Sequence, residues 1–131
     1  MRSAQLLLLF SALAAVNPAA AASSGTQAAG TYQRKGAYSQ RAKISVAAAP
    51  DRFAGSFYTG MSGCAGEVEM IGRAVSSTEI LFTKKDEAGG TCRIRVKFDE
   101  NYRSARMSED GCMFWHGASC DFEGTLKRTQ R

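Results

Sequence analysis

The stretch from residue 91 to 98 constrains the fold most, because apolar and basic side chains alternate along it without interruption, as TCRIRVKF. Successive side chains of a β-strand point to opposite faces of its sheet. A period of two therefore predicts a strand with one buried face and one solvent-facing face. This segment indicates a β-protein whose core lies on one side of its sheet.

Further segments of strand character recur at short spacing, at residues 52–59, 66–71, 79–83, 104–108 and 123–128. Turns rich in glycine, aspartate and asparagine separate them, and no window shows a helical period. This pattern predicts an all-β domain, a small antiparallel β-barrel or sandwich of about six to eight short strands. Gly55, inside the first of these segments, is expected to mark a β-bulge.

The first 22 residues have the pattern of a signal peptide. Arg2 precedes an apolar run from Leu6 to Val16, and an alanine tract follows. The run is too short to cross a bilayer, which takes about 20 apolar residues. Residues 1–22 are therefore predicted to be removed on export, which places the protein in the periplasm or outside the cell without a transmembrane span.

Residues 23–50 are rich in Ala, Ser, Gly and Gln and contain few large apolar side chains. Such a segment buries too little surface to offset the entropy of ordering it. We expect a flexible basic arm over residues 23–50. A short strand at Lys43 to Val46 is an alternative for that part of the arm. The β domain would then span residues 51–131.

The net charge of +5 is concentrated in that predicted arm. Beyond residue 52, acidic and basic residues are equal in number. A nucleic-acid-binding domain carries its positive charge on the folded part, so no nucleic-acid partner is expected.

Four cysteines in an exported domain of this size predict two disulfides that reinforce a modest core. Four cysteines allow three pairings. One pairing joins Cys112 to Cys120 and Cys64 to Cys92. If Asp99 to Tyr102 is a hairpin turn, Cys92 instead lies near Cys112, which leaves Cys64 for Cys120. The residues alone do not choose between these.

The stretch GCMFWHGASCDFEGTL, residues 111–126, contains the only tryptophan and the only histidine. Phe114, Trp115 and His116 on a cross-linked loop could form an exposed binding tip, since aromatic residues often dominate interfaces. The alternative is that these aromatics close one end of the fold as core. His116 could be a base or a pH switch, or a loop residue with a single hydrogen bond.

No catalytic constellation accompanies His116, since the chain lacks a nucleophile elbow, an H-E-x-x-H motif and a phosphate-binding loop. A zinc site of Cys112, His116 and Cys120 would need a spacing that zinc knuckles do not have. We expect no enzyme activity, no metal and no cofactor.

Arg93, Arg95 and Lys97 form a basic stripe on the solvent face of the alternating strand. One interpretation pairs them with acids such as Glu67 and Glu69 on a neighbouring strand. The other is contact with an acidic partner or an anionic glycan of the cell envelope. Glu67 and Glu69 could in turn meet a basic partner such as a lysozyme.

The segment CMFWHGASCDFEGTLKR resembles a motif of small secreted bacterial proteins grouped with LprI-type lysozyme inhibitors. The matching positions are Cys112, Trp115, Gly117, Ala118, Phe122 and Gly124. The chain departs from the motif at His116, where the family has its second cysteine, and at Leu126, where it has an aromatic residue. The resemblance implies that Cys120 replaces that cysteine as the partner of Cys112, which favours the local pairing.

The resemblance also implies a function. We expect an exported bacterial binding protein that inhibits a lysozyme-like hydrolase by occlusion with a rigid loop. The alternative is an envelope-associated module that binds anionic polysaccharide or lipid head groups through its basic residues.

Overall fold

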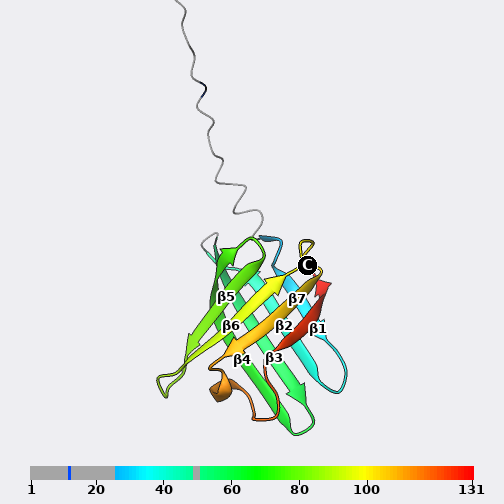
Figure 1. Ribbon diagram of the computed structural model, residues 1–131, viewed down its shortest axis with the longest axis vertical. Helices are drawn as coiled ribbons and strands as arrows, with labels where there is room; N and C mark the ends of the chain where they lie inside the picture. Colours follow the sequence, from blue (N-terminus) through cyan, green and yellow to red (C-terminus); the bar gives the residue numbers. More distant parts are fainter. Residues whose placement is uncertain (1–11, 13–25, 49–50) are drawn as a thin grey trace, which may run out of the picture.

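The computed structural model describes residue 12, residues 26–48 and residues 51–131. Over these residues the chain forms a closed barrel of antiparallel strands (Figure 1). Its elements are β1 (Gly30–Arg34), β2 (Ser39–Val46), β3 (Arg52–Met61), β4 (Cys64–Ser76), β5 (Glu79–Lys85), β6 (Thr91–Phe98), β7 (Ser104–Asp110), the 3₁₀ helix η1 (Met113–Trp115) and β8 (Gly124–Gln130). Each strand pairs with the next in sequence, and β1 pairs with β8. The predicted all-β class is confirmed, and the architecture is a barrel. The predicted signal peptide lies outside the described residues, apart from position 12.

The prediction of a flexible arm is wrong for residues 30–34 and 39–46, which form β1 and β2. These strands close the barrel, β1 against β8 and β2 against β3. Their inward positions hold only a few large side chains, Tyr32 and Ile44 among them, both buried. The composition of the segment was misleading because its order depends on hydrogen-bond ladders with β3 and β8, which the segment's own residues do not reveal. The barrel therefore begins well before residue 51.

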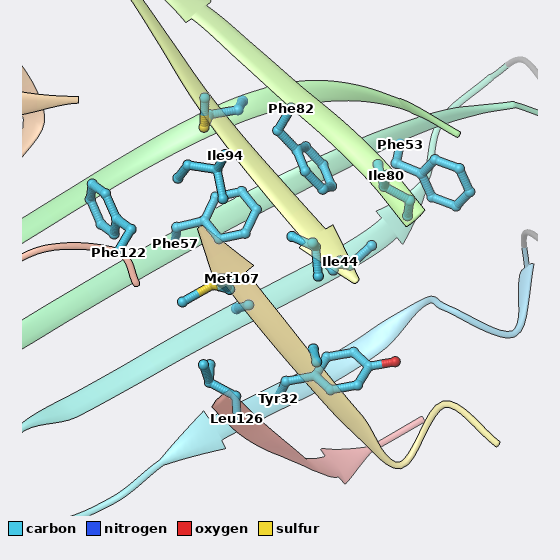
Figure 2. Close-up of a cluster of buried hydrophobic side chains, with 14 of the residues drawn as sticks. Tyr32, Ile44, Phe53, Phe57, Ile80, Phe82, Ile94, Met107, Phe122 and Leu126 are labelled. Atoms are coloured by element: carbon cyan, nitrogen blue, oxygen red, sulfur yellow. The ribbon is translucent and has the colours of Figure 1, made fainter. Parts of the chain in front are cut away.

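The core fills the interior of the barrel with the inward side chains of all eight strands (Figure 2). The alternating strand behaves as predicted, because its apolar residues are buried and its basic residues are exposed. The rings of Phe57 and Phe82 meet edge to face with their centroids 4.9 Å apart. This contact packs side chains of β3 and β5 together inside the barrel, across the intervening β4.

Gly55 does not form the predicted bulge, because β3 and β4 pair without a register shift along their whole overlap. Its role is spatial. A Cβ atom at this position would lie 2.7 Å from a ring carbon of Phe57 and 2.7 Å from one of Phe82. Glycine therefore makes room for two aromatic rings inside the barrel.

The two ends of the barrel differ. The turns after β1, β3, β5 and β7 lie at one end, which we call the cap end. Both described chain ends lie at the other, where Thr31 pairs with Gln130 (Figure 1). At that second end the Arg128 guanidinium donates hydrogen bonds to the carbonyl oxygens of Gln27 (2.8 Å) and Tyr102 (3.1 Å). These bonds hold the residues that precede β1 against the barrel.

Candidate binding surface at the cap end of the barrel

Residues 111–123, which we call the cap loop, connect β7 to β8 and cover the cap end (Figure 1). The loop begins at Gly111, whose φ of +72° is a conformation that glycine adopts without strain. It ends with Phe122, which is fully buried and belongs to the core (Figure 2). Phe122 thus anchors the loop by inserting its ring into the mouth of the barrel.

Two disulfides fix the cap loop to the wall of the barrel. Cys92 on β6 is bonded to Cys112, and Cys64 on β4 is bonded to Cys120. The local pairing that the family resemblance favoured is therefore wrong. The reason is the register of β6 and β7, in which Arg93 lies opposite Asp110 and brings Cys92 beside Cys112. Each end of the loop is thereby bound to a different strand.

His116 is buried in the cap loop, with 2% of its side chain exposed. Its Nε2 lies 2.9 Å from Oε1 of Glu109, and its Nδ1 lies 2.6 Å from the carbonyl oxygen of Gly117. The other carboxylate oxygen of Glu109 accepts a hydrogen bond from the Phe122 N–H at 2.8 Å. An imidazole ring can donate from both nitrogens only when it is protonated. This geometry suits a buried imidazolium–carboxylate pair that holds both halves of the loop.

Two opposing effects act on the pKa of His116. Burial lowers it, whereas the hydrogen bonds to Gly117 and Glu109 and the charge of Glu109 raise it. The net result is a pKa above the ordinary value of 6.5. The expectation of a loop histidine with a single hydrogen bond was therefore too simple, since both ring nitrogens have partners.

A polar cluster joins the cap loop to the hairpin of β1 and β2. The Tyr38 hydroxyl lies 2.7 Å from Oδ1 of Asp121 and accepts a hydrogen bond from the Asp121 N–H at 3.0 Å. The buried Gln40 amide donates to the carbonyl oxygens of Asp121 (3.1 Å) and Glu123 (2.8 Å). The loop is thus held on a third side of the barrel mouth, in addition to its two disulfides.

Trp115 is half-buried and packs against the core, so the core interpretation fits this residue better than the binding-tip interpretation. The Lys84 ammonium lies 4.9 Å from the centre of the indole ring. It also donates a hydrogen bond to the carbonyl oxygen of Glu69 at 2.9 Å. A cation in this position is attracted to the face of the indole ring and links the cap loop to β4 and β5.

Met113 and Phe114 are the exposed part of the cap loop, with exposed fractions of 63% and 53%. The Phe114 ring packs edge to face on Trp115 with a centroid distance of 5.0 Å. Of the three predicted contact residues in this loop, only Phe114 faces solvent to this extent. Trp115 is half-buried, and the side chain of His116 is buried.

The basic stripe lies on the outer face of β6, with Arg93, Arg95 and Lys97 exposed. Its predicted pairing with Glu67 and Glu69 does not form, because β4 is not a neighbour of β6. Arg95 instead contacts Glu79 on β5, with 3.1 Å between Nη1 and Oε1. The stripe lies on the wall of the barrel, apart from the exposed residues of the cap loop.

The zinc arrangement that we considered is not formed, because Cys112 and Cys120 belong to different disulfides and His116 contacts Glu109. No group of three or more metal-ligating side chains occurs in the part of the chain that the structure describes. Among the described residues, no helix has the length and apolar character needed to span a bilayer.

Sequence reasoning missed Glu109, Phe122 and Tyr38 as residues that organise the loop. Glu109 lies just beyond the strand predicted at residues 104–108, in a β7 that extends to Asp110. Its distance from His116 in sequence is only seven residues, but no motif marks such a pair. Phe122 carried a weak signal, because it is a large apolar residue in the resemblance motif and was not considered as core.

Comparison of the chain with protein-family models, with curated proteins and with solved structures finds no match.

Proposed function

We propose that this chain is an exported bacterial binding protein that inhibits a lysozyme-like hydrolase by occlusion with its cap loop, without catalysis of its own. The observation that supports this proposal most is the exposure of Phe114 and Met113 on a loop held by two disulfides. Export of the chain to the periplasm or beyond rests on the predicted signal peptide and is compatible with the disulfides.

The rigidity of the cap loop favours binding. Ordering a mobile loop on association lowers affinity, and a loop that is ordered beforehand avoids this loss. Here Cys112, Cys120 and Phe122 fix the loop on both sides of the exposed residues. Phe114 can therefore enter an apolar pocket of a partner without rearrangement of the backbone.

The surroundings of the loop suggest the charge of the partner. Gly66 on β4 pairs with His116, and the exposed residue Glu67 follows it directly. Glu69 is also exposed on the same strand. Carboxylates beside an apolar tip suit an enzyme whose cleft has a basic rim, because complementary potentials accelerate association.

An inhibition assay tests the proposal. The protein is titrated against a panel of lysozymes and other peptidoglycan hydrolases, and the clearing of peptidoglycan is followed. Phe114→Ser should weaken inhibition about 30-fold or more, as expected for an aromatic hot-spot residue. Val75→Ser is the matched control, because Val75 is a similarly exposed apolar residue on β4, outside the cap loop. Full inhibition by a Met113→Ser, Phe114→Ser double variant would contradict the proposal.

A second function, binding of an anionic envelope polymer, is favoured by one observation on the wall of the barrel. Lys97 lies directly opposite Arg106 on β7, and both are exposed. Neither has an acidic partner within ion-pair distance among the described residues. Like charges in this relation repel each other, and a bound anion would remove that repulsion.

Salt dependence tests the second function. Wild-type protein should bind the carboxylated polysaccharide polygalacturonate at about 10 mM salt and lose it at about 150 mM, where exposed charges are screened. A Lys97→Gln, Arg106→Gln double variant should bind several-fold more weakly. An Arg73→Gln, Arg103→Gln variant is the control of equal charge. If both variants bound polygalacturonate equally weakly, net charge would determine binding and the position of Lys97 and Arg106 would not.

A further inference from the structure

The outer wall of the barrel carries a groove of about 460 Å³ that lies over β3 and does not include the exposed residues Met113 and Phe114 of the cap loop. Its floor includes the short side chains of Ala54 and Ser56 on β3. Longer side chains line it on either side, Lys43 from β2 and Glu69 and Ile71 from β4. A groove of this volume is within the range of sites for small molecules, about 300–1,000 Å³.

The groove has a structural cause. Pairing between β4 and β5 ends at Ile71 and Thr83, and the two strands do not pair beyond this point. Lys84 then closes this side of the groove, because its ammonium donates a hydrogen bond to the carbonyl oxygen of Glu69. The same ammonium lies over the ring of Trp115. Lys84 therefore connects the groove to Trp115, the only tryptophan of the chain.

The groove combines an apolar patch with two opposite charges. Ile71 is 57% exposed, which is unusual for a large aliphatic side chain on a strand. Lys43, Ser56 and Glu69 occupy one row across three strands, because Lys43 lies opposite Ser56 and Ser56 opposite Glu69. Two strand spacings separate the backbones of Lys43 and Glu69 by about 10 Å. Neither charged group has an ion-pair partner within the described part of the chain.

This charge pattern selects the class of ligand. A simple anion would meet the Glu69 carboxylate, and a simple cation would meet the ammonium groups of Lys43 and Lys84. A zwitterion gives both charged side chains a partner of opposite charge, with its carboxylate toward Lys43 and its ammonium toward Glu69. Such charge-assisted hydrogen bonds are stronger than neutral ones. The apolar side chains of the ligand would then cover Ala54 and Ile71.

We propose that the groove over β3 binds a small zwitterion with apolar side chains, of the size of a dipeptide with free termini. The site shares Glu69 with the carboxylates beside the cap loop but does not include Phe114, and it would operate whether or not the protein inhibits a hydrolase.

Calorimetric titration with leucyl-leucine tests the proposal, and the fluorescence of Trp115 gives a second readout through Lys84. Lys43→Met and Glu69→Gln should each weaken binding about tenfold, because each removes one charged partner while keeping the length of the side chain. Lys127→Met is the control, since Lys127 is an exposed lysine on β8. Two further probes separate the contribution of the ligand's charges from that of its apolar side chains. N-acetyl-leucyl-leucine amide lacks the charges, and glycyl-glycine lacks the apolar side chains, so both should bind more weakly than leucyl-leucine.

Four results would overturn the proposal. These are no heat and no fluorescence change with leucyl-leucine at millimolar concentration, equal binding of the uncharged analogue, equal binding of glycyl-glycine, or unchanged affinity in both groove variants. Because Lys43→Met leaves Phe114 and the carboxylates beside the cap loop intact, its hydrolase inhibition should equal that of the wild type. A failure of the groove is thereby distinguished from a failure of the cap loop.

Discussion

At the scale of single residues, the pair of His116 and Glu109 decides how the cap loop is held. The pair is almost completely buried and has hydrogen-bond partners on both sides. Removal of one partner from such a pair leaves a buried group without compensation, which typically costs about 3–5 kcal/mol. The aromatic tip depends on this pair, because His116 directly follows Trp115 and Phe114.

The raised pKa of His116 predicts a specific pH dependence of stability. A histidine whose pKa is higher in the folded than in the unfolded protein contributes stability below the unfolded value of 6.5. That contribution is lost as pH rises through the pKa of the folded protein. The free energy of unfolding attributable to this group should therefore decrease as pH rises above 6.5 and become constant once pH exceeds the raised pKa of the folded protein.

Denaturant unfolding at several pH values, with NMR titration of the single histidine, measures this effect. In Glu109→Gln the pKa of His116 should fall and the alkaline loss of stability should shrink. Glu123→Gln removes an exposed carboxylate at the end of the cap loop and should leave both unchanged. A His116 pKa at or below 6.5 in the wild type would contradict the assignment of a buried imidazolium.

At the scale of elements, the two disulfides bind one loop to two strands, but they close segments of different length. Cys64 and Cys120 are 56 residues apart, and Cys92 and Cys112 are 20 apart. In the chain-entropy account, a disulfide stabilises by restricting the unfolded chain, and a longer closed segment gives more stabilisation. The two bonds should therefore contribute differently to the free energy of unfolding, although both hold the same loop.

We expect loss of the Cys64–Cys120 bond to cost about 1 kcal/mol more than loss of the Cys92–Cys112 bond. The two double alanine variants remove the same atoms, so each serves as the control for the other. Urea unfolding gives the free energies directly. Equal costs, or a larger cost for the shorter segment, would show that local packing around the cysteines outweighs chain entropy.

At the scale of the whole molecule, closure of the barrel presents the cap loop away from both described chain ends (Figure 1). A tag or surface linkage at the C-terminus should therefore leave Phe114 accessible. Closure also removes every sheet edge, which in an open sheet would be a site for aggregation. Both properties depend on β1 and β2, the strands that composition assigned to an arm.

A chain that begins at Asp51 should fail to fold, because removal of β1 and β2 exposes the edges of β3 and β8 and part of the core. A chain that begins at Thr26 retains all eight strands and is the control. Size-exclusion chromatography and thermal unfolding distinguish them. Cooperative unfolding of a monomeric chain of residues 51–131 would show that the first two strands are dispensable.

The local pattern of the sequence determined the strands whose neighbours are close in sequence. The alternation of residues 91–98 specifies a half-buried strand by itself, since side-chain direction in a strand follows a period of two. The recurrence of short strand segments made the all-β class predictable, and the four cysteines made the disulfides predictable. In the candidate site, the sequence indicated a cross-linked loop with aromatic residues, and the structure shows Phe114 exposed on that loop.

The tertiary structure decided everything that depends on distant partners. The choice between the two cysteine pairings that the residues left open depended on the register of β6 and β7. The order of β1 depended on its pairing with β8, which is far away in sequence, and the buried position of His116 depended on Glu109 on a different element. A strand or a buried charge is stabilised by its neighbours in space, and the linear order of residues does not specify those neighbours.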